Sequence, residues 1–305
     1  MTALVSALCV LCALLGVGQA WFGGGGPAWN DLKAPWDLNP FSNGFSSFPR
    51  NINKDKMTGW SLQQNFCGQS GAMHVGMRYM KNNDPTVMLL FDVNGYIAGM
   101  QNAYPATIYQ PSSLHRGYST LRERINGKWW YVLTIYFVDI SVVCTGRSAA
   151  QFKAQGTGNR FLIQNGSDPT VAGSVISIPL NENDLQTQAS SLGVQGRPHW
   201  VGPKCFWTMG NHYWFNIHEN MPCDQFFNFC LLYNKRRLNA MCFGVNGYWE
   251  SPNKFDDRPH PNAKALPGFM KAGHIPKCFS TNPAFQKLST MHVYFTSNPE
   301  TGDTC

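Results

Sequence analysis

The chain carries the stretch FDVNGY at residues 91–96 and repeats it as FGVNGY at 243–248, with five identities in six positions. Around each copy, a tryptophan and a cysteine come before the stretch, and an aromatic apolar run and a cysteine come after it. These landmarks are Trp60, Cys67, 135–137 and Cys144 in the first half, and Trp214, Cys223, 293–295 and Cys305 in the second. Self-similarity at this long period predicts two copies of one folding unit.

The local pattern around both copies is that of strands and turns. The apolar run 87–91 ends at Asn94-Gly95, a strong hairpin-turn dipeptide, and residues 129–138 follow a second such pair at 126–127. Residues 161–164 and 175–180 look similar, and only 72–81 and 184–193 have the pattern of short helices. We therefore predict a mainly β protein: two divergent tandem β-repeats packed together, sandwich or barrel-like, and disulfide-bonded.

The expected organisation has five segments. They are a signal peptide at 1–20, an extended Gly/Trp/Phe-rich arm at 21–55, β-repeat 1 at 56–149, a connecting segment with a glycosylation sequon at 150–199, and β-repeat 2 at 200–305. The aromatic residues of the arm are expected either to dock on the body of the protein or to bind a partner. A groove or cavity is expected where the two repeats meet, because ligands usually bind at such seams.

A secretory signal, a glycosylation sequon and an even number of cysteines together predict a secreted, extracellular protein. Residues 4–17 are nearly all apolar and are followed by small residues at 18 and 20, as in a secretory signal, although no Lys or Arg precedes Lys33. The run is too short to cross a membrane, and no other stretch approaches ~18 apolar residues, so no transmembrane segment is expected. Asn165 begins an acceptor sequence for N-linked glycan.

Eight cysteines remain once the signal is removed, and an even number in an exported chain predicts disulfide bonds. They are Cys67, Cys144, Cys205, Cys223, Cys230, Cys242, Cys278 and Cys305. A turn at 234–237 would place Cys230 opposite Cys242, and a turn at 82–85 would place Met77 opposite Leu90 in the first half. The flanking landmarks then predict the pairs Cys67–Cys144 and Cys223–Cys305, which leaves Cys205–Cys278.

The stretch 211–219 predicts a strand with two different faces. His212, Trp214, Asn216 and His218 would share one face. Because the two histidines would then lie about 20 Å apart, one metal ion needs a bend at Asn216 or ligands from elsewhere. The outside candidates are His74, His199 and His292, with Met73 and Met77 for a soft ion such as copper. The tentative metal ligands are His74, His212 and His218, and neither the metal nor any cofactor is identified.

Tryptophans supply the candidate residues for ligand binding. Residues 129–131 and several tryptophans of the second half suit sugar stacking or an apolar pocket, and they suit a β-protein core equally. The tentative ligand-binding residues are Trp130, His199, His212, Trp214 and His218.

No catalytic residue can be assigned, and whether the protein is an enzyme stays open. The sequence around Cys67 partly resembles the nucleophile motif of papain-like proteases, but Ser70 replaces its second cysteine and the following aromatic is absent. A paired cysteine also cannot be a nucleophile. Nucleotide-binding loops and serine-hydrolase motifs are absent, and no spacing pairs two carboxylates.

The net charge of the chain gives only limited information about its binding partner. The net charge is +7, and the run 235–237 is the only tight basic cluster, so no basic stripe for nucleic acid is present. A mild attraction to acidic glycans stays open.

The expected function is a secreted extracellular binding protein that holds a small apolar ligand or a glycan between two β-repeats. One alternative is a secreted oxidoreductase using a metal bound by His and Met, or oxygen, with His74, His199, His212 and His218 as its residues. The other is a self-assembling extracellular matrix or adhesive protein that associates through residues 21–55.

Overall fold

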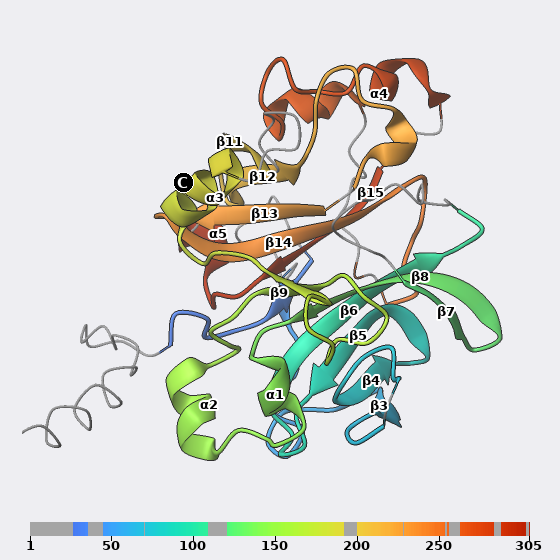
Figure 1. Ribbon diagram of the computed structural model, residues 1–305, viewed down its shortest axis with the longest axis vertical. Coiled ribbons are helices and arrows are strands. Elements are labelled where there is room, and N and C mark those ends of the chain that lie inside the picture. Colours follow the sequence, from blue (N-terminus) through green and yellow to red (C-terminus); the bar gives the residue numbers. More distant parts are fainter. Residues whose placement is uncertain are drawn as a thin grey trace, which may run out of the picture.

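The computed structural model describes residues 27–35, 45–69, 71–108, 121–191, 200–227, 229–253, 255, 263–283, 288–302 and 305. The described part is mainly β and contains two antiparallel sheets that lie one above the other (Figure 1). In this part of the chain, no helix is long and apolar enough to cross a membrane.

The first sheet is built by the middle of the chain, and the second sheet by its two ends. The first contains β3 (Trp60–Asn65), β4 (Met77–Lys81), β5 (Asp84–Phe91), β6 (Ile97–Pro105), β7 (Leu121–Ile125), β8 (Lys128–Tyr136), β9 (Leu162–Gln164) and β10 (Val175–Ser177). Its order is β10-β9-β8-β6-β5-β4-β3, and β7 pairs with β8 off this path. The second contains β1 (Lys33–Ala34), β2 (Ser46–Ser47), β11 (Trp200–Phe206), β12 (Gly210–Phe215), β13 (Phe229–Asn234), β14 (Arg237–Asn246) and β15 (Leu288–Tyr294), in the order β11-β12-β13-β14-β15-β1-β2.

Short helices fill the connections between strands. They are α1 (Ile140–Val143), α2 (Ala149–Gln155), α3 (Glu182–Ser191), α4 (Cys278–Thr281), α5 (Pro299–Gly302) and the 3-10 helices η3 (Cys223–Gln225) and η4 (Ala263–Gly268). The helix expected at 184–193 is confirmed by α3. The helix considered for 72–81 is wrong, because residues 77–81 form β4, which pairs with β3 on one side and β5 on the other.

One apolar core fills the space between the two sheets. Leu89 and Ile135 enter it from the first sheet, and Leu231 and Val293 enter it from the second. All four side chains are fully buried. Burying a side chain of this kind stabilises the fold by about 1.5–3 kcal/mol, so the shared core holds the sheets together as a sandwich.

The described part of the N-terminal arm belongs to this core. Trp29 stacks on Phe295 with ring centroids 4.3 Å apart, and its indole N–H donates to the backbone oxygen of Leu238 at 2.7 Å. Phe48 is also buried, and β1 pairs with β15 as a further strand of the second sheet. The arm residues Trp21, Phe22, Trp36 and Phe41 lie outside the described residues.

The two FxVNGY stretches take different backbone conformations. In the first, a carboxylate oxygen of Asp92 accepts from the amides of Asn94 and Tyr96 at 3.0 Å each, which fixes a turn between β5 and β6. The other oxygen accepts from the buried Arg147 guanidinium at 3.0 Å. In the second, glycine replaces Asp92, and β14 continues to Asn246 in register with β15. The second stretch has no carboxylate at this position to fix the same turn, and the tandem repeat stays a prediction.

In the two central hairpins, a shift of one residue in the strand pairing changes which residues face each other. The turn expected at 234–237 is confirmed, and Cys230 faces Cys242. In the first half the two turn residues are 82 and 83, both asparagines with φ of 50° and 58°. Met77 therefore faces Phe91, and the predicted pair of Met77 with Leu90 is wrong. Asparagine tolerates this left-handed region, whereas the ring of a proline cannot adopt it, so the turn precedes Pro85.

All eight cysteines in the described part of the chain are paired. The bonds Cys67–Cys144 and Cys230–Cys242 are as predicted, with Cα–Cα distances of 5.2 and 4.9 Å. The other two predicted bonds are wrong, because the structure joins Cys205 to Cys305 and Cys223 to Cys278.

The position of the C-terminal segment explains the first of these corrections. Cys205 faces Asn211 across β11 and β12, and Asn211 faces Tyr233 on β13. The neighbouring Asn234 donates from its side chain to the backbone oxygen of Gly302, which brings the chain end to this row. Cys305 thus reaches Cys205, and Cys223 is left for Cys278 in α4.

Candidate functional site

Ligand-type side chains gather on the outer face of the second sheet. Trp214, Cys230, Cys242 and His292 form one cross-strand row over β12, β13, β14 and β15. His212 lies two residues before Trp214 and therefore on the same face of β12. Ligand atoms of His212, Cys230 and His292 all lie within 4.8 Å of one another. We call these four residues, His212, Cys230, Cys242 and His292, the buried cluster.

A cover of loops and short helices shuts the buried cluster off from solvent. Leu266 of η4, Met270 and Phe279 of α4 belong to the apolar core that lies on this outer face. In Figure 1 this cover lies above the second sheet, on the side away from the first. His212 is 1% exposed and His292 is 6% exposed, so both imidazoles lie in an apolar surrounding.

The electrostatics of the buried cluster keep His212 neutral. Burial lowers the pKa of His212 to about 3, with the nearby His292 as the next cause, and backbone hydrogen bonds at Gly210 and Lys204 oppose the shift. Its Nδ1 lies 3.2 Å from the oxygen of Gly210, and its Nε2 has no partner among the described residues. A neutral imidazole is the form that binds a metal.

The disulfide decides what the buried cluster can do in this state. Cys230 is bonded to Cys242, and a cysteine ligand must be a thiolate. With the disulfide closed, the buried cluster therefore offers two imidazoles, fewer than the three or four ligands of a zinc site.

The structure separates the three tentative metal ligands. His212 belongs to the buried cluster, and its nearest ligand-type neighbours are Cys230 and His292, not His74 or His218. The strand ends at Phe215, because Asn216 has a φ of 49°. His218 therefore lies beyond the bend and is half-buried.

His74 lies with the first sheet instead. It is buried and packs against Phe66, with ring centroids 4.6 Å apart. Neither ring nitrogen has a partner among the described residues. His199 lies outside the described residues.

The two tentative ligand-binding tryptophans are buried. Trp130 is 6% exposed and donates to the backbone oxygen of Ile125 at 3.3 Å. Trp214 is 5% exposed and donates to the backbone oxygen of Phe269 at 2.8 Å. Both indoles pack in apolar clusters on the outer faces of the sheets, so neither offers a ring to a ligand at the surface.

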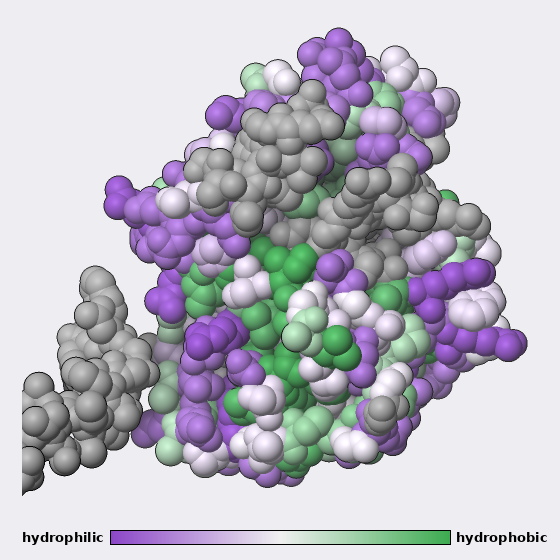
Figure 2. Space-filling view, in the orientation of Figure 1, coloured by the Kyte–Doolittle hydropathy of each residue, from purple (hydrophilic) through white to green (hydrophobic). Residues whose placement is uncertain are grey.

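The neighbouring Trp129 is the exposed tryptophan of the β7–β8 hairpin. It is 47% exposed, and the guanidinium carbon of Arg122 lies 4.4 Å from its ring centroid. Arg124 faces Trp129 across the hairpin, and Arg122 faces Tyr131. The hairpin projects from the edge of the molecule and is largely hydrophilic on the visible face (Figures 1 and 2). We call Arg122, Arg124, Trp129 and Tyr131 the hairpin platform.

Because side chains alternate between the two faces of a strand, the only acidic residue of the hairpin, Glu123, does not lie on the face of the platform. Glu123 lies on the opposite face of β7 and accepts from the two terminal nitrogens of Arg78 at 2.9 and 2.7 Å. This ion pair is buried, with 3% and 12% of the two side chains exposed. The platform therefore carries exposed cations next to an aromatic ring, with no acid on its own face.

An open groove lies beside the hairpin platform, and a much smaller cavity lies among the described residues at the seam between the sheets. The groove has a volume of about 560 Å³ and is lined by Pro105, Thr107, Ile108, Arg122, Lys128 and Trp129. At the seam, a cavity of about 20 Å³ lies among Asn102, Tyr104, Phe243 and Trp249. A cavity of that size accommodates one water molecule, and a small organic ligand needs ~300 Å³ or more.

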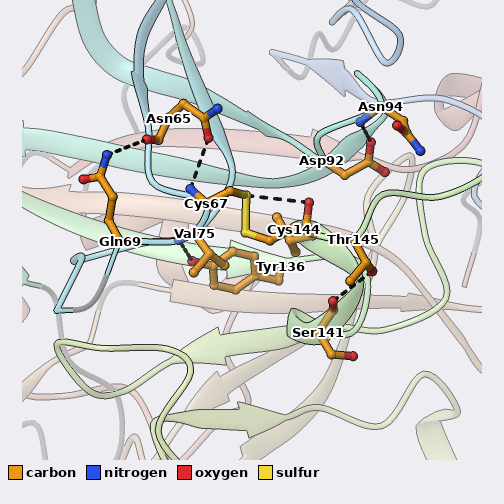
Figure 3. The surroundings of a disulfide bond; sticks show 11 residues. Asn65, Cys67, Gln69, Val75, Asp92, Asn94, Tyr136, Ser141, Cys144 and Thr145 are labelled. Atoms are coloured by element: carbon orange, nitrogen blue, oxygen red, sulfur yellow. Dashed lines mark hydrogen bonds between the residues drawn. A yellow bond between two sulfur atoms is a disulfide. The ribbon is translucent and has the colours of Figure 1, made fainter.

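A second surface groove, of about 660 Å³, lies beside the Cys67–Cys144 bond. Figure 3 shows this bond together with Ser141 and its neighbours, and Figure 2 shows apolar side chains over the same part of the molecule, where β9 and α1 lie. Both sulfurs are bonded, so Cys67 is no nucleophile. The Ser141 hydroxyl donates to Asp139 at 2.6 Å as part of a helix cap, and this bond lowers the pKa of Asp139. No activated hydroxyl or thiol follows from this arrangement.

Comparison of the chain with protein-family models, with curated proteins and with solved structures gives no match. The hairpin platform and the buried cluster are the two places in the described part of the chain whose geometry indicates a function. Sequence reasoning included His212 and named His292 only as an outside ligand. It named Trp130 as a ligand-binding residue and did not name Trp129. Neighbouring side chains of β8 point to opposite faces, and this alternation is the signal that distinguishes the two residues.

Proposed function

We propose that this protein is a secreted extracellular binding protein that holds an anionic glycan on the hairpin platform. The observation that carries the proposal is the exposed pair of Trp129 and Arg122, 4.4 Å apart, on a hairpin whose only acid is turned away and paired. Aromatic rings and arginine are the side chains that dominate binding surfaces.

The chemistry of the platform suits sugars that carry carboxylate or sulfate groups. The apolar face of a sugar ring stacks on an indole, and a guanidinium binds a planar anion through two parallel N–H donors. Arg124 and Lys128 are exposed on the same hairpin and add positive charge. Because these cations are in contact with water, binding is expected to weaken as salt rises.

Other features of the chain support the extracellular part of the proposal. Four disulfides are typical of proteins that fold in an oxidising compartment. The proposed glycan acceptor Asn165 is half-buried at the start of the β9–β10 connection, directly after β9. We retain the duplication as part of the proposal, since each FxVNGY stretch begins on the second strand of a central hairpin: at the last residue of β5 in β4–β5, and within β14 in β13–β14.

The competing functions have less support. The cavity that the described residues form at the seam is too small for an apolar ligand, so we do not retain that part of the expectation. Self-association through residues 21–55 has less support because Trp29 and Phe48, two aromatic residues of this segment, are buried in the core. An oxidoreductase would need an open coordination position, and the buried cluster is sealed beneath its cover.

The test is binding of the secreted protein to heparin, a sulfated polysaccharide, with neutral dextran as the comparison. Trp129→Ala and Arg122→Ala are each expected to weaken heparin binding at least about tenfold, which corresponds to about 1.4 kcal/mol. Raising the salt concentration is expected to weaken binding of the wild-type chain, and dextran is expected not to bind. The binding constants are measured by calorimetry.

Matched variants control for general loss of aromatic area or charge. Trp207 is 57% exposed in the second half of the chain, and Arg160 is exposed away from the hairpin. Trp207→Ala and Arg160→Ala are expected to bind heparin like the wild type. Equal losses in platform and control variants, or no loss with Trp129→Ala, would show that the platform is not the binding site.

A further inference from the structure

We propose that the buried cluster is a latent His2Cys2 site for a thiophilic metal ion of the Zn²⁺ or Cu⁺ class. The Cys230–Cys242 disulfide closes this site, and reduction of the disulfide opens it. The four side chains come from four neighbouring strands of one sheet: His212 from β12, Cys230 from β13, Cys242 from β14 and His292 from β15. Two imidazoles and two thiolates are a common ligand set for structural zinc.

The distances among three members of the buried cluster, His212, Cys230 and His292, are close to those of a tetrahedral site. Zinc bonds of about 2.0–2.3 Å place the ligand atoms roughly 3.3–3.8 Å from one another. Ligand atoms of His212, Cys230 and His292 already lie within 4.8 Å of one another, so shifts of about 1 Å close the site. Cys242 faces both Cys230 and His292 in the strand register, which gives the fourth ligand.

An unpaired ring nitrogen of His212 is a second observation, separate from these distances, that points to a ligand. Its Nε2 is buried without a partner among the described residues, and such an atom in an apolar core requires a physical explanation. Its Nδ1 lies 3.2 Å from the oxygen of Gly210, the outer contact that orients many metal-binding histidines. A metal ion on Nε2 would satisfy the atom that the closed state leaves unpaired.

The opening step is a thiol–disulfide exchange, which takes place when local opening of the cover admits the reductant to the sulfurs. Two thiols of a small-molecule reductant give two electrons and two protons to the sulfurs of Cys230 and Cys242, and the reductant becomes a disulfide. Metal binding then displaces the two thiol protons to solvent. Oxidation reverses both steps, so the metal ion and the disulfide exclude each other. By linkage, a metal that binds the open form makes the pair easier to reduce.

The first test uses Co²⁺ as a spectroscopic probe. Cys242→Ala leaves Cys230 as a thiol beside both imidazoles and prevents the disulfide from forming. This variant is expected to bind one Co²⁺ per chain with a thiolate-to-cobalt charge-transfer band, which Zn²⁺ abolishes. Adding His292→Ala is expected to weaken Co²⁺ binding at least about tenfold.

Two controls decide the origin of the band. The oxidised wild type and the double variant Cys230→Ala/Cys242→Ala are both expected to show no charge-transfer band. Circular dichroism checks that each variant is folded. Absence of the band in a folded Cys242→Ala chain, or the same band in the double variant, would overturn the proposal.

A second test needs no substitution and applies even if the variant does not fold. The wild-type chain is equilibrated in glutathione buffers with and without Zn²⁺, and the thiols are mapped by alkylation and mass spectrometry. Zinc is expected to shift the Cys230–Cys242 pair toward the reduced form while leaving Cys67–Cys144 unchanged. No shift, or an equal shift in both pairs, overturns the proposal, because unfolded thiols would bind zinc without selection.

Discussion

At the scale of single residues, His74 is a buried titratable group that the fold holds in its neutral form. Burial lowers its pKa well below the ordinary value, and the positive charge of Arg78 lowers it further. Above pH 6.5 the imidazole is neutral in both the folded and the unfolded chain. As the pH falls below 6.5, the unfolded chain gains a proton that the folded chain does not, so the free energy of unfolding decreases.

His74→Phe is therefore expected to make the protein less sensitive to acid. The phenyl ring keeps the contact with Phe66, and the variant loses one histidine that favours the unfolded state at low pH. Each such histidine lowers the free energy of unfolding by up to about 1.4 kcal/mol per pH unit below 6.5. Urea denaturation at pH 8 and at pH 5 measures the effect.

The measurement at pH 8 is the internal control, since no difference due to protonation is expected there. His212 remains in the variant and keeps its own acid sensitivity in the same direction. If the variant and the wild type lost equal stability between pH 8 and pH 5, His74 would not be the group that titrates.

At the scale of elements, the ion pair of Arg78 and Glu123 fixes the position of β7. This strand pairs only with β8 in the sheet, yet Glu123 reaches Arg78 on β4, with β5, β6 and β8 between them in the pairing order. The first sheet must curl to allow this contact. The guanidinium also donates to Gln101 at 3.4 Å, and Gln101 donates to Thr134 at 2.9 Å, so a polar network crosses the outer face.

Glu123→Ala is expected to destabilise the protein by about 3–5 kcal/mol, because it leaves a buried guanidinium without its carboxylate. The double variant Arg78→Met/Glu123→Leu removes both charges and is expected to recover most of that loss. Denaturant unfolding of the wild type, the single variant and the double variant gives the three free energies. A loss below about 1 kcal/mol in the single variant, or an equal loss in the double variant, would show that the pair does not hold β7.

At the scale of the whole molecule, contacts between distant segments hold the two halves together. Asp84 on the first sheet accepts from Ser251 at 2.6 Å, and Trp249 donates to Thr86 at 3.3 Å. The Cys205–Cys305 bond spans 100 residues of sequence and ties the last residue to the edge strand β11. This bond is expected to contribute mainly by restricting the unfolded chain.

Cys205→Ser/Cys305→Ser is expected to lower the free energy of unfolding by about 3–5 kcal/mol, since the loop it closes is long. Thermal unfolding at fixed pH gives the change, and substituting the exposed Ser280 by alanine provides a control with an expected change within about 0.5 kcal/mol. A loss below 1 kcal/mol would mean that the C-terminal segment stays in place without the bond.

Local sequence patterns were enough to predict the strands, turns and disulfide that depend on residues close together in the chain. Asn-Gly pairs and apolar runs predicted β5, β8 and their turns, and the polar stretch around 184–193 predicted α3. The register of the second hairpin predicted Cys230–Cys242, because a turn fixes which residues face each other nearby. For the candidate site, this reasoning included His212 and placed a tryptophan cluster at the β8 hairpin.

Which side chains share a face of a strand, and which distant strands meet, follow only from the tertiary structure. Successive side chains on a strand point to opposite faces, so one residue of register separates the exposed Trp129 from the buried Trp130, and Arg78 from Met77. The meeting of His212 with His292, and of Cys205 with Cys305, depends on strand order and on where the chain end docks. Local patterns carry no information on either, because both arise from packing between segments that lie far apart in the sequence.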